Sequence, residues 1–267
     1  MHRPTRAMTT ALSACVAARA IHLKYLDSHE VIVKKDGSPV TVADREAEAA
    51  MRAIILDVFE NDGIIGEEGG ETRGSSGRDW IVDPLDGTIQ YVRGMSDFGT
   101  LLCRVDDQGI ELGVVMHTAS DTFWMAERGR GTWKAVGLSE RIPKGPPTAV
   151  RVDARPVPDR FQDAVTCFGH PNRLADAGIC INRLMKSFPT QLTVPRFQAF
   201  TLVAEGKLDI FVARLVNDWD LLANQIIVEQ ARGTVISFDL ANGRHVVAAR
   251  SRELAEETVA EIMRSIG

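Results

Sequence analysis

The stretch of sequence that decides the fold is Asp79–Tyr91, which reads DWIVDPLDGTIQY. Trp80–Val82 is a short apolar run of the kind that forms a buried strand. Proline has no N–H to donate to a neighbouring strand, so we expect the strand to stop at Asp83-Pro84. Asp83 and Asp86 then lie close together on a tight turn at the carboxyl end of a strand.

Two carboxylates on one tight turn repel each other, and a hard divalent cation relieves that repulsion. Mg²⁺ prefers carboxylates, waters and phosphate oxygens, whereas Zn²⁺ prefers nearby His or Cys ligands. Gly87 lets the backbone approach a ligand, and the N–H groups around Gly87-Thr88 can bind an anion. The alternative interpretation is an Asp-Pro turn with an aspartate helix cap, which needs no metal.

Composition indicates an ordinary globular protein of 267 residues, with 45% hydrophobic and 25% charged residues. A net charge of −5 and the lack of a basic run argue against a nucleic-acid partner. No apolar run approaches the roughly 20 residues of a membrane span, and the N-terminal segment suits an amphipathic helix better than a signal peptide. Four cysteines without a C-x-x-C pair suggest buried free thiols, so we expect a cytoplasmic protein.

Two predicted domains follow from the order of the elements. Helices over about 8–27 and 41–59, with Asp44 in the first turn of the second, precede a short strand over 64–66, which leads to Glu67, and an antiparallel meander. Prolines over 143–147 mark a boundary, which gives an N-terminal α+β domain (1–145) carrying most metal ligands. Helices and strands alternate in the C-terminal α/β domain (146–267), where Asp220 suits the N-cap of a helix starting at Leu221.

Four motifs carry a family resemblance. They are Thr41–Asp44 (TVAD), Gly66–Glu68 (GEE), Asp83–Thr88 (DPLDGT) and Trp219–Ala223 (WDLLA), in that order. Together they resemble the signature set of the inositol monophosphatase family of Mg²⁺-dependent phosphomonoesterases, over nearly the whole chain. The resemblance implies a layered αβαβα sandwich. The family also includes histidinol-phosphate phosphatases, nucleotide 3′-phosphatases and some fructose-bisphosphatases.

The resemblance also implies two or three Mg²⁺ ions and their ligands. Glu67, Asp83 and the Leu85 carbonyl would bind the first ion. Asp83, Asp86 and Asp220 would bind the second, and a third, weaker ion would lie near Glu67. Charge supports this arrangement, because several acids and a phosphate need cations between them, and ions about 4 Å apart can clamp the attacking and leaving oxygens.

The implied catalytic residues are Asp44, Thr88 and Glu67. The expected mechanism is in-line attack by a metal-activated water, which Thr88 and Asp44 orient and whose proton they accept. The residues expected to contact the substrate are Asp86, Gly87, Thr88, Arg196 and Asp220.

The sequence departs from the family pattern where substrates are selected. Val194–Phe197 replaces the small-residue run of inositol-specific members, and Ala213-Arg214 stands where their acid would fall. Both changes weaken an inositol assignment and, less directly, a histidinol one. Val92–Gly94 and Phe98–Leu101 resemble histidinol-phosphate phosphatases, although packing alone could explain them. We hypothesise that Arg196 faces the pocket and recognises an anionic group; the alternative is a surface arginine or an ion pair within its domain.

The expected function is therefore Mg²⁺-dependent hydrolysis of a small phosphate monoester of the inositol-phosphate, histidinol-phosphate or sugar-phosphate type, by a homodimer as in relatives. One alternative is a phosphatase for a bisphosphate nucleotide or sugar, motivated by Arg196 and Arg214. Another is a catalytically silent binding or regulatory protein of the same fold. A dinucleotide oxidoreductase is poorly supported, because no G-x-G-x-x-G follows a strand.

Overall fold

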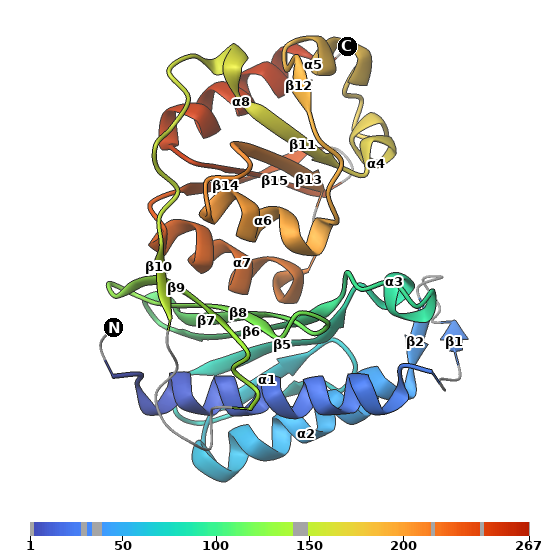
Figure 1. The fold of residues 1–267 in the computed structure, drawn as a ribbon, viewed down its shortest axis with the longest axis vertical. Coiled ribbons are helices and arrows are strands. Elements are labelled where there is room, and N and C mark those ends of the chain that lie inside the picture. Colours follow the sequence, from blue (N-terminus) through green and yellow to red (C-terminus); the bar gives the residue numbers. More distant parts are fainter. Residues whose placement is uncertain are drawn as a thin grey trace. The chain divides into compact units, whose positions relative to one another are not determined.

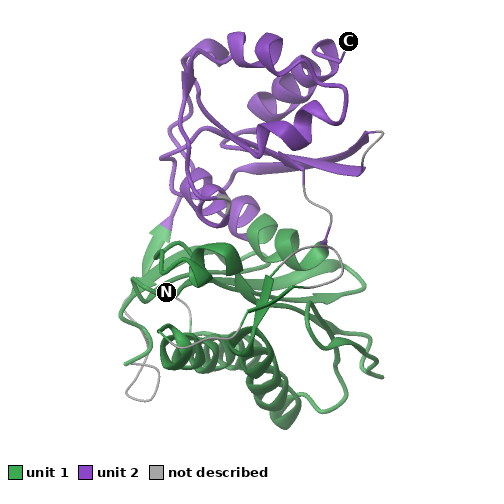
Figure 2. Cartoon of the chain, turned by 90° about the vertical axis from the view of Figure 1, so that its right-hand side faces the viewer, with its two compact units in different colours: residues 1–151, 218–226 green, residues 152–217, 227–267 purple. Residues whose placement is uncertain are grey.

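The structure is a computed structural model that describes residues 3–27, 31–33, 39–140, 149–214, 217–240 and 243–266. The chain forms two compact units (Figure 2): Met1–Arg151 with Asp218–Ile226, and Val152–Asn217 with Ile227–Gly267. The predicted boundary at 145/146 lies outside the described residues. The segment with Asp220 belongs to the first unit, whereas the predicted C-terminal domain included it.

Two long helices of the first unit, α1 (Arg6–Tyr25) and α2 (Val42–Val58), pack against each other and against a sheet (Figure 1). Thr5 caps α1, since its side chain accepts the Met8 N–H. Thr41 and Asp44 form a capping box at the start of α2, as the sequence predicted. No helix within the described ranges is long and apolar enough to cross a membrane.

The sheet of the first unit has eight strands in the order β10-β9-β8-β7-β6-β5-β3-β4. Strands β6 to β9 form the predicted antiparallel meander, and β5 pairs antiparallel with β6 but parallel with β3. A separate hairpin pairs β1 (Val31–Val33) with β2 (Pro39–Thr41). The strands of the large sheet are β3 (Gly63–Gly66), β4 (Gly70–Thr72), β5 (Asp79–Asp86), β6 (Gly99–Asp106), β7 (Gly109–His117), β8 (Thr122–Glu127), β9 (Gly131–Val136) and β10 (Val150–Val152).

Strand β5 continues through Pro84 to Asp86, so the predicted stop at Asp83-Pro84 is wrong. The register of β5 against β6 shifts between Asp83 and Asp86, which marks a bulge at this point. Proline is tolerated in a bulge because the ladder does not need its missing N–H there.

The core of the first unit lies between the helix pair and one face of this sheet. Its members are apolar residues at helical spacing and alternate strand residues, including Met51, Ile55, Trp80, Val82 and Val114. Gly113 faces the other side of the sheet, where a Cβ would overlap the side chain of Ile226. The first turns of α7 (Asp218–Gln230) therefore pack closely on β7 from that side.

The second unit has a five-stranded mixed sheet in the order β12-β11-β13-β15-β14. One face of it packs on α8 (Arg252–Arg264) and on the short helices α4 (Pro171–Ala175) and α5 (Ile181–Lys186), while Phe200 of α6 (Arg196–Ala204) packs on Phe211. A 3₁₀ turn, Phe161–Asp163, precedes β11. The strands are β11 (Val165–Gly169), β12 (Thr190–Gln191), β13 (Ile210–Arg214), β14 (Thr234–Leu240) and β15 (Gly243–Ala249).

Two local predictions for the second half are wrong. Helix α7 begins at Asp218 with Asn217 as its N-cap, so Asp220 lies inside the first turn and is not the cap. Cys180 is exposed, whereas Cys15, Cys103 and Cys167 are buried free thiols as expected.

Candidate active site

The parallel pairing of β3 and β5 places two acidic segments next to each other. Gly66 is in register with Val82, so the next residues, Glu67 and Asp83, lie side by side at the carboxyl end of β3. The Glu67 N–H donates to the Val82 carbonyl at 3.1 Å, which ties the end of β3 to β5. Two carboxylates from separate segments are therefore neighbours because of strand direction alone.

The residues after Asp83 form a tight, ordered turn. Asp83 Oδ1 accepts the Leu85 N–H at 3.0 Å, which fixes the carboxylate over its own backbone. Gly87 then adopts a φ of +93° and caps the short helix α3 (Thr88–Val92). The turn thus presents Asp83, Asp86 and Thr88 from a rigid backbone.

The third carboxylate comes from α7. One carboxylate oxygen each from Asp83, Asp86 and Asp220 lies within 4.8 Å of the others. Asp83 is only 1% exposed, whereas Asp86 and Asp220 are partly exposed. The group of three acids therefore extends from the interior towards the surface. These three acids are the set that the family resemblance assigns to the second Mg²⁺.

The electrostatics of the group are strongly unfavourable without a cation. Burial raises the pKa of Asp83 well above its ordinary value, and the carboxylates of Glu67, Asp86, Asp220 and Asp44 raise it further. A buried carboxylate surrounded by four others needs either a proton or a positive ion. The donor set is all oxygen, which suits a hard divalent cation.

Asp44 and Thr88 meet beside this group. The Thr88 hydroxyl lies 3.3 Å from Asp44 Oδ1 and 3.1 Å from the Leu85 carbonyl oxygen, so it can donate to either acceptor. Asp44 Oδ2 accepts the Thr41 N–H at 2.8 Å and the Thr41 hydroxyl at 2.7 Å. Burial raises the pKa of Asp44, and these bonds from Thr41 only partly oppose that effect.

The structure brings most of the predicted site residues together within the first unit. Glu67 acts on Asp83 and Asp44 through its charge, although it is outside the group of three carboxylates. Arg196 is the first residue of α6 in the second unit, and its side chain lies outside the described parts of the chain. The roles predicted for these residues therefore stay predictions.

Three polar residues support the site although no sequence motif pointed to them: His22, Glu48 and Thr100. Glu48 had a usable signal, because it follows Asp44 by one helical turn on the same face of α2. His22 and Thr100 both lie within hydrogen-bond distance of the Pro84 carbonyl oxygen. No local pattern marks these two, since their partners are distant in the sequence.

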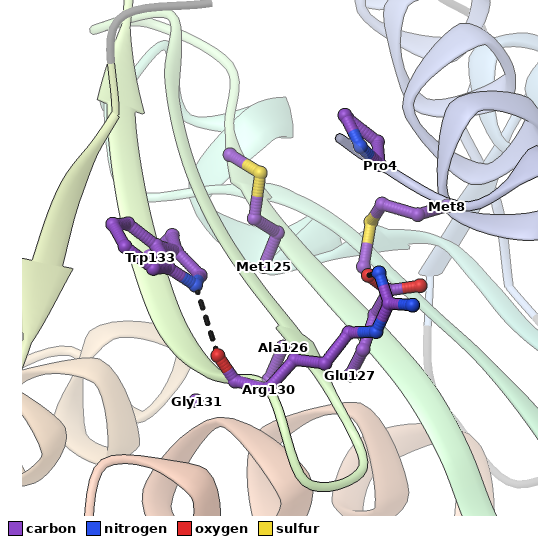
Figure 3. A pocket seen from close by; sticks show the side chains of 8 residues that line it. All are labelled: Pro4, Met8, Met125, Ala126, Glu127, Arg130, Gly131 and Trp133. Atoms are coloured by element: carbon purple, nitrogen blue, oxygen red, sulfur yellow. Dashed lines mark hydrogen bonds and ion pairs between the residues drawn. The ribbon is translucent and has the colours of Figure 1, made fainter. Parts of the chain in front are cut away.

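A separate pocket of the first unit lies beside the start of α1 and the β8–β9 hairpin (Figure 3). Of its lining residues, Glu127 is the acid, and it already accepts the Thr5 hydroxyl and pairs with Arg130 at 3.6 Å. The Trp133 indole N–H donates to the Arg130 carbonyl at 3.2 Å. This pocket lacks a set of oxygen ligands, so we do not assign the chemistry to it.

The fold of the chain is similar to that of solved structures. The chain is similar to the extragenic suppressor protein suhB from Bartonella henselae, with a TM-score of 0.80 and 22% identity over 98% of this chain and 100% of that chain. This similarity confirms the layered α+β fold that the sequence predicted.

The sequence of the chain is similar to a known protein family and to proteins of that family. Residues 4–266 match the model of the inositol monophosphatase family. A histidinol-phosphatase from Mycobacterium tuberculosis is 34% identical over 79% of this chain and 79% of its own length. An inositol-1-monophosphatase from Rhizobium meliloti is 30% identical over 89% of this chain and 85% of its own length. With the acidic site in place, the chain belongs to the inositol monophosphatase family of metal-dependent phosphomonoester hydrolases.

Proposed function

We propose that the protein is a Mg²⁺-dependent phosphatase that hydrolyses a small phosphate monoester at the Asp83 turn. The observation that carries the proposal is the meeting of Asp83, Asp86 and Asp220, whose ligand atoms lie within 4.8 Å of one another around a buried carboxylate. The first ion would be held by Glu67, Asp83 and the Leu85 carbonyl, and the second by the three clustered aspartates. A third, weaker ion would lie near Glu67.

Bound Mg²⁺ would supply positive charge between the carboxylates and the phosphate, and would acidify a nearby water. The chain's own residues then have two tasks. Thr88 accepts a hydrogen bond from the attacking water and passes its own hydroxyl proton towards Asp44 Oδ1, 3.3 Å away. Asp44 suits this task because its raised pKa makes it a better base than an exposed aspartate.

Substrate binding uses the same turn. The backbone N–H groups of Gly87 and Thr88 would bind phosphate oxygens. Asp83, Asp86 and Asp220 would hold the ion that stabilises the leaving alkoxide, which a water held near Asp220 would protonate. Arg196 would recognise an anionic group on the substrate. Positioning and charge neutralisation together account for catalysis of this kind, without a covalent intermediate on the protein.

Histidinol phosphate is the first substrate to test. The support is the similarity to the histidinol-phosphatase from Mycobacterium tuberculosis. The residues at Val194–Phe197 count against inositol phosphate more directly than against histidinol phosphate. The Phe98–Leu101 segment no longer adds support, because Phe98, Thr100 and Leu101 are at most 1% exposed. Their burial favours the packing explanation that the sequence left open.

The test is phosphate release from a substrate panel, with and without Mg²⁺. The panel contains histidinol phosphate, inositol 1-phosphate, fructose 1,6-bisphosphate, adenosine 3′,5′-bisphosphate and glycerol 2-phosphate, and Asp83→Asn serves as the blank. We expect strong Mg²⁺-dependent turnover of histidinol phosphate that the variant lacks. Preference for either bisphosphate would favour the alternative motivated by Arg196 and Arg214. Turnover of none by folded, Mg²⁺-binding protein would favour the silent binding protein.

We also propose a cytoplasmic homodimer. The buried free thiols Cys15, Cys103 and Cys167 suit a reducing compartment, and the dimer rests on the analogy with relatives. Sedimentation equilibrium should give twice the chain mass of 29.3 kDa. A concentration-independent mass of one chain would contradict the dimer.

A further inference from the structure

Glu48 is a buried carboxylate that binds the loop after β3. It is 2% exposed, on the face of α2 that it shares with Asp44. Its Oε2 accepts the Glu68 N–H at 2.7 Å, and its Oε1 accepts the Gly69 N–H at 2.8 Å. A carboxylate that receives two successive backbone N–H groups fixes both the position and the direction of that backbone.

Arg52 completes this anchor one helical turn further on. Its Nε donates to Glu48 Oε1 at 2.7 Å, and its other nitrogens donate to the Gly70 carbonyl and, at 3.0 Å, to the Thr72 hydroxyl. The pair therefore holds both ends of the turn between β3 and β4. The fit is close, because a Cβ on Gly66 would overlap the Glu48 carboxylate.

The backbone around Glu67 is held at three successive N–H groups. Glu67's own N–H is bound by the Val82 carbonyl, and the next two N–H groups are bound by Glu48. Its carboxylate is close enough to Asp83 and Asp44 to raise the pKa of both. The distance from Glu67 to the other site acids thus depends on where Glu48 holds the loop.

We infer that Glu48 is a positioning residue for Glu67: by anchoring the Glu68 and Gly69 N–H groups, it sets the ligand geometry that Mg²⁺ meets at the first site. The inference rests on the proposed function, because it takes Glu67 as a magnesium ligand. The two carboxylate oxygens of Glu48 bind the Glu68 and Gly69 N–H groups and Arg52. Its effect passes through the backbone, as that of residues behind a metal ligand commonly does.

The test compares Glu48→Gln with Asp62→Asn. Glutamine keeps the shape of Glu48 but has one acceptor oxygen, and its NH₂ group would face a donor. Asp62 is a matched control: it is 4% exposed, and it accepts bonds from Arg104 at 2.7 Å and from the Trp80 indole at 2.8 Å. Both changes neutralise a buried carboxylate paired with arginine in the first unit, but Asp62 lies before β3, at the end of the strand away from Glu67.

The first readout is the Kd for Mg²⁺ by titration calorimetry without substrate, and the second is kcat and KM at saturating Mg²⁺. We expect Glu48→Gln to weaken Mg²⁺ binding by roughly 10-fold, in the range seen for residues behind metal ligands, with little change in substrate KM. Asp62→Asn should lower Tm but leave the Mg²⁺ Kd unchanged. Equal Mg²⁺ affinity in wild type and Glu48→Gln, or equal losses in both variants, would overturn the inference.

A second variant covers the case in which Glu48→Gln does not fold. Arg52→Lys keeps the charge but loses the fork that binds Glu48, Gly70 and Thr72, so it should weaken Mg²⁺ binding in the same direction. Folded Arg52→Lys with wild-type Mg²⁺ affinity would count against the anchor. The calorimetric readout does not depend on turnover, so failure of the proposed reaction and failure of the Glu48 role give different results.

Discussion

His22 Nε2 lies 3.0 Å from the carbonyl oxygen of Pro84, in the segment that carries Asp83 and Asp86. A carbonyl only accepts, so Nε2 carries the proton and Nδ1 accepts the Thr118 hydroxyl at 2.9 Å. Thr100 donates to the same Pro84 oxygen at 2.9 Å. Two buried donors therefore fix the Pro84 carbonyl within the bulge in β5.

Replacing His22 by phenylalanine should destabilise the protein and reduce its activity. Phenylalanine keeps an aromatic ring at this position, but the Thr118 hydroxyl is left with the Met116 sulfur at 3.7 Å and the Pro84 carbonyl with the Thr100 hydroxyl. Losing the two buried hydrogen bonds of His22 should cost about 1–3 kcal/mol. Urea unfolding measures the loss, and unchanged stability would show that the two hydrogen bonds contribute little.

The same histidine predicts a dependence of stability on pH. Burial lowers the pKa of His22 to about 3 from 6.5, against a smaller opposing effect of the Pro84 carbonyl. Below pH 6.5 the unfolded chain binds a proton that the folded protein excludes, so stability falls as pH falls towards 3. The contribution is about 1.4 kcal/mol per pH unit and is absent above pH 6.5.

The check is urea unfolding of wild type and His22→Phe at several pH values, without added metal. The difference in unfolding free energy between the two should shrink as pH falls from 6.5. A constant difference over this range would mean that His22 titrates normally in the folded protein.

Asp83→Asn should remove activity yet stabilise the metal-free protein. The amide cannot carry the charge that the neighbouring acids oppose, so the repulsion around a buried group disappears. A gain of about 1 kcal/mol would raise Tm by roughly 2–4 °C in a protein of this size. Mg²⁺ should raise the Tm of wild type and have little effect on the variant. A metal-free Tm below that of wild type would contradict this account of the site.

Thr88 and Asp44 should behave as one catalytic unit. Thr88→Ala removes the hydroxyl that reaches Asp44 Oδ1, and we expect kcat to fall by roughly 10²-fold with small effect on KM. Thr88→Ser keeps the hydroxyl and should retain more activity. Combining Thr88→Ala with Asp44→Asn should cost hardly more than either change alone, as measured by steady-state kinetics. If the double variant instead loses kcat by the product of the two single losses, Thr88 and Asp44 act independently and the prediction is wrong.

Arg196→Ala tests recognition of the substrate. If the guanidinium pairs with an anionic group of the substrate, KM should rise about 10-fold or more, the ratio that corresponds to 1.4 kcal/mol. Hydrolysis of a small generic phosphate ester should be nearly unaffected. An equal loss on both substrates would rule out a recognition role for Arg196.

Local sequence patterns predicted the elements that depend on local interactions. The Thr41–Asp44 cap, the meander after β5 and the acidic motifs at the ends of β3 and β5 all follow from residue type and spacing. The motif order also led to the family. These features need no knowledge of distant contacts, which is why the sequence alone reveals them.

The errors arise where distant contacts override a local rule. The strand was expected to stop at Pro84 because proline lacks an N–H. It continues because a bulge and two donors to the Pro84 carbonyl, His22 and Thr100, accommodate the proline inside β5. Asp220 falls within the predicted C-terminal domain by its place in the sequence, whereas the first turns of α7, which contain it, pack on β7 and belong to the first unit.

The most direct test of the central claim is the anomalous scattering of Mn²⁺, used in place of Mg²⁺, in crystals of the protein. We expect a strong anomalous peak within ligand distance of Asp83, Asp86 and Asp220, and loss of that peak in Asp83→Asn. Active crystals with the metal bound elsewhere, and none at these carboxylates, would contradict it.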